Sequence, residues 1–185
     1  MMKKLTGVIL ALTVTVLLNG CGDDGDGGSG VQPYPSKTPL AVGAYKLSFT
    51  AISTARLDAP ISGIDVAIGL PAGVSVDTLN GGSGQISPGA LGTGNAIIGT
   101  GLAMGNYSGA TRRVYLSMAT TQATYRSGNF LLMTFMVQPG AVVSEYDFVT
   151  LNAAYPRYKV VGMDAATRSS IILTDKVKTT LSVIR

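Results

Sequence analysis

The sequence predicts an all-β fold, a jelly-roll β-sandwich of about nine strands, over residues 40–185. Charged residues make up only 13% of the chain, while glycine occurs 24 times and serine and threonine are abundant. Such a composition favours extended structure over surface helices. Short apolar runs with a period of two recur at roughly 10- to 15-residue intervals between glycine-rich turns. Past residue 20, no window sustains helical spacing.

The first 20 residues have the organisation of a secretory signal peptide. Lys3 and Lys4 precede a 14-residue apolar run, Leu5 to Leu18. This run is shorter than the about 20 apolar residues that span a bilayer. The segment Leu18-Asn19-Gly20-Cys21 resembles the lipobox of bacterial lipoproteins. The resemblance implies cleavage before Cys21 and a membrane anchor there of diacylglycerol and palmitate. Cys21 is the sole cysteine of the chain, so an internal disulfide is excluded.

Residues 21–39 are predicted to form a flexible linker behind the lipidated cysteine. The runs GDDGDGGSG and VQPYPSKTP are rich in glycine, acid and proline and offer little apolar surface to bury. The aspartates of the first run lack the later ligands of a calcium loop, so a solvated linker is favoured over a metal site. Gly22 replaces the aspartate that retains enteric lipoproteins at the inner membrane. We therefore expect a cell-envelope protein anchored in the outer membrane, on either side of it.

Strands are expected along the rest of the chain. The run NFLLMTFMVQPG is almost continuously apolar, which predicts a central strand covered on both faces. The other expected strands lie in AYKLSFTAIS (44–53), ISGIDVAIGLPAGVSV (61–76), NAIIGTGLAM (95–104), RRVYLSMAT (112–120), DFVTLNAAY (147–155), YKVVGMD (158–164) and IILTDKVKTTLSVI (171–184).

Three of these segments resemble cohesin domains in their order of apolar and turn residues. They are ISGIDVAIGLPAGVSVDTLNGG, SGNFLLMTFMVQPGA and DFVTLNAAYPRYKVVGMD, and the resemblance covers about residues 43–185. Cohesins share their jelly-roll sandwich with a group of carbohydrate-binding modules. The resemblance therefore implies a non-catalytic recognition or scaffolding domain. Its partner would be a dockerin-like or other envelope protein, or a polysaccharide. The alternative is a structural envelope or assembly lipoprotein with no separate ligand.

Catalytic chemistry finds little support in the residues. The chain has no histidine, its cysteine is assigned to lipid, and it contains no G-x-S-x-G element. Glu145 and Asp147 would share one face of a strand, as a glycosidase pair might, or lie in a solvated loop after Pro139-Gly140. There is no tryptophan to form a sugar platform. The sequence thus predicts no enzyme, cofactor or metal. Net charge falls from +4 to +2 once Lys3 and Lys4 leave, and no nucleic-acid partner is expected.

Tyrosines are the main candidates for ligand contact, because a phenol ring offers an apolar face and a hydroxyl. Tyr155 and Tyr158, which flank Pro156 and Arg157, form the best local cluster. The other candidates are Tyr107 and Tyr125, whereas Tyr45 and Tyr115 are expected to cap the core. Coplanar exposed tyrosines would favour carbohydrate binding, and a flat apolar sheet face with a polar rim would favour protein binding.

Overall fold

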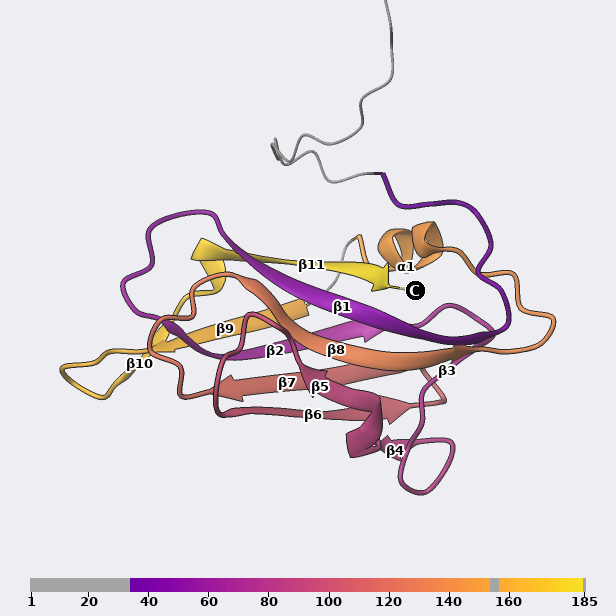
Figure 1. Cartoon of the computed structure of the whole chain (residues 1–185), viewed down its shortest axis with the longest axis horizontal. Coiled ribbons are helices and arrows are strands. Elements are labelled where there is room, and N and C mark those ends of the chain that lie inside the picture. Colours follow the sequence, from indigo (N-terminus) through magenta and orange to yellow (C-terminus); the bar gives the residue numbers. More distant parts are fainter. Residues whose placement is uncertain (1–33, 154–156, 185) are drawn as a thin grey trace, which may run out of the picture. The chain divides into compact units, whose positions relative to one another are not determined.

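Two antiparallel sheets face each other across one hydrophobic core in the computed structural model, which describes residues 34–153 and 157–184 (Figure 1). The first sheet has the order β11-β1-β8-β3, and β5 also pairs with β8. The second sheet has the order β10-β9-β2-β7-β6-β4. The predicted all-β sandwich is confirmed. The strands are β1 (Gly43–Ser53), β2 (Ile61–Gly69), β3 (Val74–Ser75), β4 (Gly84–Gln85), β5 (Leu91–Thr93), β6 (Gly101–Ser108), β7 (Arg113–Thr120), β8 (Gly128–Val137), β9 (Arg157–Met163), β10 (Ser170–Ile172) and β11 (Val177–Ile184).

Aromatic side chains from both halves of the chain meet in the core. Phe135 on β8 has its ring centroid 5.8 Å from that of Tyr45 and 4.8 Å from that of Phe148. Phe49 and Phe130 form a second pair, 6.1 Å apart. Aromatic pairs at these distances add to the free energy gained by removing apolar area from water. Tyr45 therefore caps the core as expected.

Strand β8 is central, as predicted, because β1, β3 and β5 all pair with it. The expectation that both of its faces are covered is wrong. Leu131, Met133, Phe135 and Val137 are buried, whereas the intervening Met136 is 41% exposed. From Leu131 onward the near-continuous apolar run is therefore a period-two strand with Leu132, Thr134 and Met136 on its outer face, and the buried Phe130 falls where the register with β1 shifts.

The expected strand over residues 147–155 is wrong as well, because its first part belongs to the short helix α1 (Glu145–Leu151). Ser144 caps the helix: its hydroxyl accepts from the Asp147 backbone N–H, and the Asp147 carboxylate accepts from the Ser144 N–H at 2.7 Å. This capping box satisfies N–H groups that a helix start leaves unpaired. The Asp147 carboxylate also accepts from the Ser144 hydroxyl at 2.7 Å, and this bond, together with the one from the Ser144 N–H, holds the pKa of Asp147 below its usual range.

Because Glu145 and Asp147 lie on helix α1, they do not form the carboxylate pair that a strand would have placed on one face. On a helix, residues two apart point in different directions. Glu145 accepts hydrogen bonds from the backbone N–H groups of Val183 and Ser36, at 3.1 and 3.4 Å. Both acids therefore secure the start of α1, and the suggested strand-borne glycosidase pair does not form.

Two other expected strands have different bounds. The segment 95–104 is extended only from Gly101, and the segment 171–184 divides into β10 and β11 around the 3₁₀ turn η2 (Thr174–Lys176). A second 3₁₀ turn, η1 (Pro88–Ala90), precedes β5. The folded part takes in residues before 40, since Pro39 forms a bridge with Ser144. Within the described ranges, no helix has the length and hydropathy needed to cross a membrane.

Candidate binding surface

The outer face of β9, β2, β7 and β6 is the most distinctive surface of the described residues, and we call it the second-sheet face. Its composition follows from the alternation along β7. Val114, Leu116 and Met118 are buried in the core, so Tyr115, Ser117 and Ala119 point outward. The same alternation sets the outward residues of the neighbouring strands.

Register places these outward residues in rows across the sheet. Ala119 lies between Gly63 on β2 and Leu102 on β6. The next rows are Asp65, Ser117 and Met104, then Ala67, Tyr115 and Asn106. Glycine, alanine and serine thus form a low floor along β2 and β7. Larger side chains rise from it, with Leu102 54%, Met104 49% and Tyr115 51% exposed.

Two hollows open on this face. The apolar hollow, of about 290 Å³, lies around Gly63 and Ala119, with Leu102, Met104 and Val161 among the side chains that line it. A side chain larger than alanine on the floor would fill it. The Cβ of any residue at position 63 would already lie 3.1 Å from Val161 Cγ2. The hollow is therefore a consequence of the small residues in the two central strands.

The second hollow, of about 270 Å³, lies at the other end of the same strands, and we call it the arginine hollow. Its lining comes from the end of β2, the β6–β7 turn, β7 and the end of α1. The residues are Ala67, Ile68, Gly69, Leu70, Thr111, Arg112, Arg113, Tyr115 and Leu151. Arg112 is exposed and Arg113 is half-buried. Tyr115 lies between the two hollows, in the row that separates them.

Leu151 forms one edge of the arginine hollow, and the buried side-chain amide of the next residue, Asn152, holds this edge in place. Its Oδ1 accepts from the Gly69 N–H at 2.8 Å, and its Nδ2 donates to the carbonyl oxygens of Gly69 and Phe148, at 3.0 and 2.8 Å. A buried amide with these partners ties the end of α1 to the end of β2. The arginine hollow is consequently built into the fold.

The outer face of the first sheet is more polar. Its cross-strand rows contain Ser48 beside Ser182, Thr50 beside Thr180, and Lys46 beside Thr134. Met136 is the one methionine on this face whose side chain is substantially exposed among the described residues. Ile52 and Ile184 are also exposed there, at 39% and 44%, but each pairs with a lysine, Lys178 and Lys46, so the apolar side chains of this face are separated by polar ones.

The predicted tyrosine sites fall elsewhere. Tyr158 and Tyr107 are half-buried against the core, because register places them on the inner side of β9 and β6. Tyr125 is only 2% exposed, and its hydroxyl donates to the Gly128 carbonyl at 3.1 Å. Burial raises the pKa of this phenol. Tyr125 has no free ring face for a ligand, so its candidacy as an exposed contact residue is wrong.

The proposed cluster around Pro156 is only partly within the described residues. Tyr155 lies outside them. Arg157 begins β9, and its backbone pairs opposite Ala67, in the same row as Tyr115. Tyr158, the next residue, belongs to the inner side of that strand. The prediction of a Tyr155, Arg157 and Tyr158 cluster therefore lies largely outside the described residues, and Tyr158 itself packs against the core.

Tyr115 is a second aromatic residue whose position differs from the prediction. It was expected to cap the core, yet about half of it is exposed at the middle of the second-sheet face. The signal was available in RRVYLSMAT, since its three apolar alternates, Val114, Leu116 and Met118, predict that Tyr115 faces the other way.

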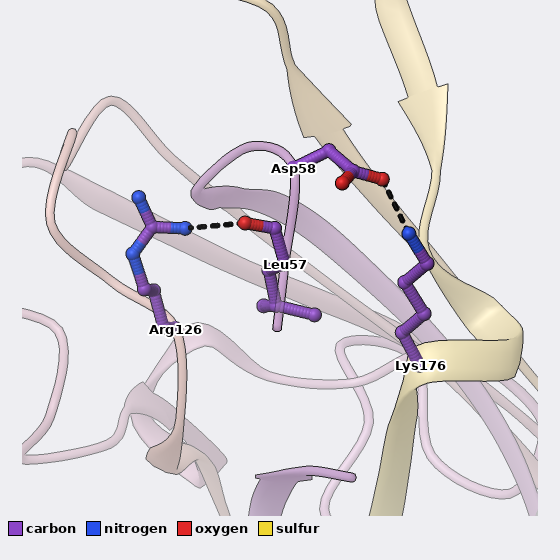
Figure 2. A network of polar contacts seen from close by, with 4 residues as sticks. All are labelled: Leu57, Asp58, Arg126 and Lys176. Carbon is purple, nitrogen blue, oxygen red and sulfur yellow. Dashed lines mark hydrogen bonds and ion pairs between the residues drawn. The ribbon is translucent and has the colours of Figure 1, made fainter. Parts of the chain in front are cut away.

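A separate group of charged residues joins the β1–β2 loop to the β7–β8 loop and to η2 (Figure 2). Arg126 Nη1 donates to the Leu57 carbonyl at 3.4 Å, and Lys176 forms an ion pair with Asp58. An exposed ion pair contributes at most about 1 kcal/mol. The group holds the loop that carries the buried Leu57 side chain, which is a structural role. Among the described residues there is no cluster of three potential metal-ligating side chains.

No family model and no curated protein matches the sequence. A chain in the crystal structure of a type II cohesin–X-dockerin complex from Acetivibrio cellulolyticus, an N-terminal interface mutant, is similar to this one with a TM-score of 0.39 and 15% sequence identity. The match covers 80% of this chain and 82% of that chain. It identifies neither a partner nor a site here.

Proposed function

We propose that this chain is a non-catalytic protein-binding module of the cell envelope. Lipidated Cys21 would anchor it, most simply in the outer membrane, and the second-sheet face would contact the partner. The observation that carries the proposal is the group of exposed side chains of Leu102, Met104 and Tyr115, from three successive rows, beside a floor of small residues. Contiguous exposed apolar surface with a polar rim is typical of protein interaction sites.

A protein partner fits this face better than a polysaccharide does. Sugar platforms use several coplanar aromatic rings, and Tyr115 is the aromatic side chain that the described residues of this face present. Methionine and leucine beside it offer adaptable apolar contact without ring stacking. The purely structural alternative would leave this apolar surface covered by other envelope subunits, which is itself a protein contact.

Met104→Glu is expected to weaken partner binding at least about tenfold, because a charge would be buried in the centre of an apolar contact. The matched control is Met136→Glu, which alters a similarly exposed methionine on the first sheet. The full chain and both variants, purified in detergent, would be immobilised and exposed to envelope proteins of the same organism. A protein bound saturably by the wild type and by Met136→Glu, and lost on Met104→Glu, is expected. Equal retention by the two variants would contradict the proposal.

Cys21→Ser is expected to move the protein from the membrane fraction to the soluble fraction, because the acyl chains contribute about 0.8 kcal/mol for each buried CH₂ group. The check is cell fractionation together with metabolic labelling by palmitate. Asp23→Ser, two residues along, is the control and should leave both anchoring and labelling unchanged. Continued membrane association of unlabelled Cys21→Ser would show that the anchor lies elsewhere.

A further inference from the structure

The arginine hollow carries positive charge next to an apolar surface. Arg112 and Arg113 line it, and none of the described residues that line it is acidic. Lys159 on β9 adds a third cation to the second-sheet face. The face has one described carboxylate, that of Asp65, which accepts from Ser117 Oγ at 2.6 Å. The charge on this surface is therefore predominantly positive, and it is concentrated at the end formed by the β6–β7 turn.

The chemistry of the hollow suits a carboxylate. A guanidinium group offers N–H donors in a planar fork that matches the two oxygens of an aspartate or glutamate side chain. Leu151, Ala67 and Gly69 give the hollow an apolar lining on one side. Tyr115 contributes an apolar ring between this hollow and the apolar hollow. A partner segment could thus place an apolar group and an acid on the same face.

We propose that the arginine hollow receives an acidic side chain of the protein partner and sets the orientation in which the partner docks. This inference rests on the proposed function, since it names the chemistry of a partner for the same face. Ala119 and Arg113 are six residues apart on β7, a separation of about 20 Å at 3.4 Å per residue. The partner therefore presents its carboxylate within about that distance of an apolar residue.

The backbone of Arg112 makes a clean test possible. Arg112 has φ 48° in the β6–β7 turn, a left-handed conformation in which glycine is favoured over arginine. Its carbonyl accepts from the Leu70 N–H at 2.8 Å, and glycine keeps that bond. Arg112→Gly therefore removes the guanidinium without a cost in backbone strain, so its melting temperature should be equal to or above that of the wild type.

A matched control exists at the other non-glycine residue with positive φ among the described residues. Arg168 has φ 58° in the β9–β10 turn and does not line either hollow. Arg168→Gly makes the same chemical change and relieves the same kind of backbone strain. A loss of binding in Arg112→Gly but not in Arg168→Gly would therefore come from the missing guanidinium group in the arginine hollow.

The probe is a displayed library of random 12-residue peptides, selected on the full chain in detergent, with depletion on Met104→Glu. We expect the selected peptides to be enriched in aspartate or glutamate. Their affinity should fall about tenfold on Arg112→Gly and stay constant on Arg168→Gly. Their affinity for the wild type should also fall as salt is raised from 50 to 300 mM, since the contact is between charges.

The outcomes separate the two proposals. One outcome is that the peptides need Met104, show no preference for acidic residues and bind Arg112→Gly as well as the wild type. That result would overturn the acidic docking role and leave the proposed binding face in place. Failure to select any peptide that needs Met104 would overturn both. Binding of anionic phosphatidylglycerol vesicles that is lost on Arg112→Gly, without acidic preference among peptides, would assign the hollow to lipid headgroups and overturn the inference.

Discussion

Replacement of Phe135 by alanine is expected to lower the free energy of unfolding by about 3–5 kcal/mol. The ring is completely buried near the end of β8, the strand that pairs with three others. The Phe135 ring contacts those of Tyr45 and Phe148, so its removal takes one aromatic contact from each. Because Tyr45 belongs to β1 and Phe148 to α1, the cavity would loosen the attachment of the helix to the first sheet.

The measurement is urea unfolding of the variant and the wild type, followed by far-ultraviolet circular dichroism. Met136→Ala, one residue along the same strand, is the control. Its side chain points outward and is 41% exposed, so we expect a loss below about 1 kcal/mol. A similar loss for both variants would show that the strand does not divide into a buried and an open face as described.

Much of the fold followed from alternation in the sequence. The expected strands over 44–53, 61–76 and 112–120 correspond to β1, β2, β3 and β7, because buried and more exposed residues alternate along β7, most of β2 and part of β1. Helix α1 was not predicted, because its seven residues span only about two turns, and helical periodicity is recognised over longer windows. Its local signature was nonetheless present: Ser144 followed three residues later by Asp147 is the spacing of a capping box.

The candidate binding face was harder to predict than the fold. That a protein-binding surface would be a flat apolar sheet face with a polar rim was anticipated as a general form, but not which sheet would provide it. The second-sheet face draws on four strands and on the end of α1, and no local pattern reveals which outward residues become neighbours. The residue type alone did not predict which tyrosines are exposed. Tyr125 lies in a loop and is buried, whereas Tyr115 lies in a strand and points outward.

Gly94→Ala is expected to destabilise the domain by about 2–3 kcal/mol, the range for overpacking a tight site. A Cβ at position 94 would lie 2.3 Å from the Asn129 carbonyl oxygen and 2.0 Å from its Oδ1. The side chain of Asn129 cannot turn away without loss, since its Oδ1 accepts from the Asn95 N–H and its Nδ2 donates to the Phe49 carbonyl and to Ser48. Gly94 also donates to the Phe130 carbonyl at 2.9 Å.

The requirement for glycine at this position is one of space and not of backbone conformation, because Gly94 is outside the left-handed region. Gly92→Ala is therefore the decisive comparison. Gly92 lies two residues earlier, in β5, likewise without a positive φ, and a Cβ there meets no atom within 4 Å. It should leave stability unchanged or raise it by up to about 1 kcal/mol, because alanine restricts the unfolded chain. Equal stability of both variants in urea unfolding would contradict the close approach of Gly94 to Asn129 on β8. It would also contradict the position of the chain after β5, beside the register shift between β1 and β8 near Phe130.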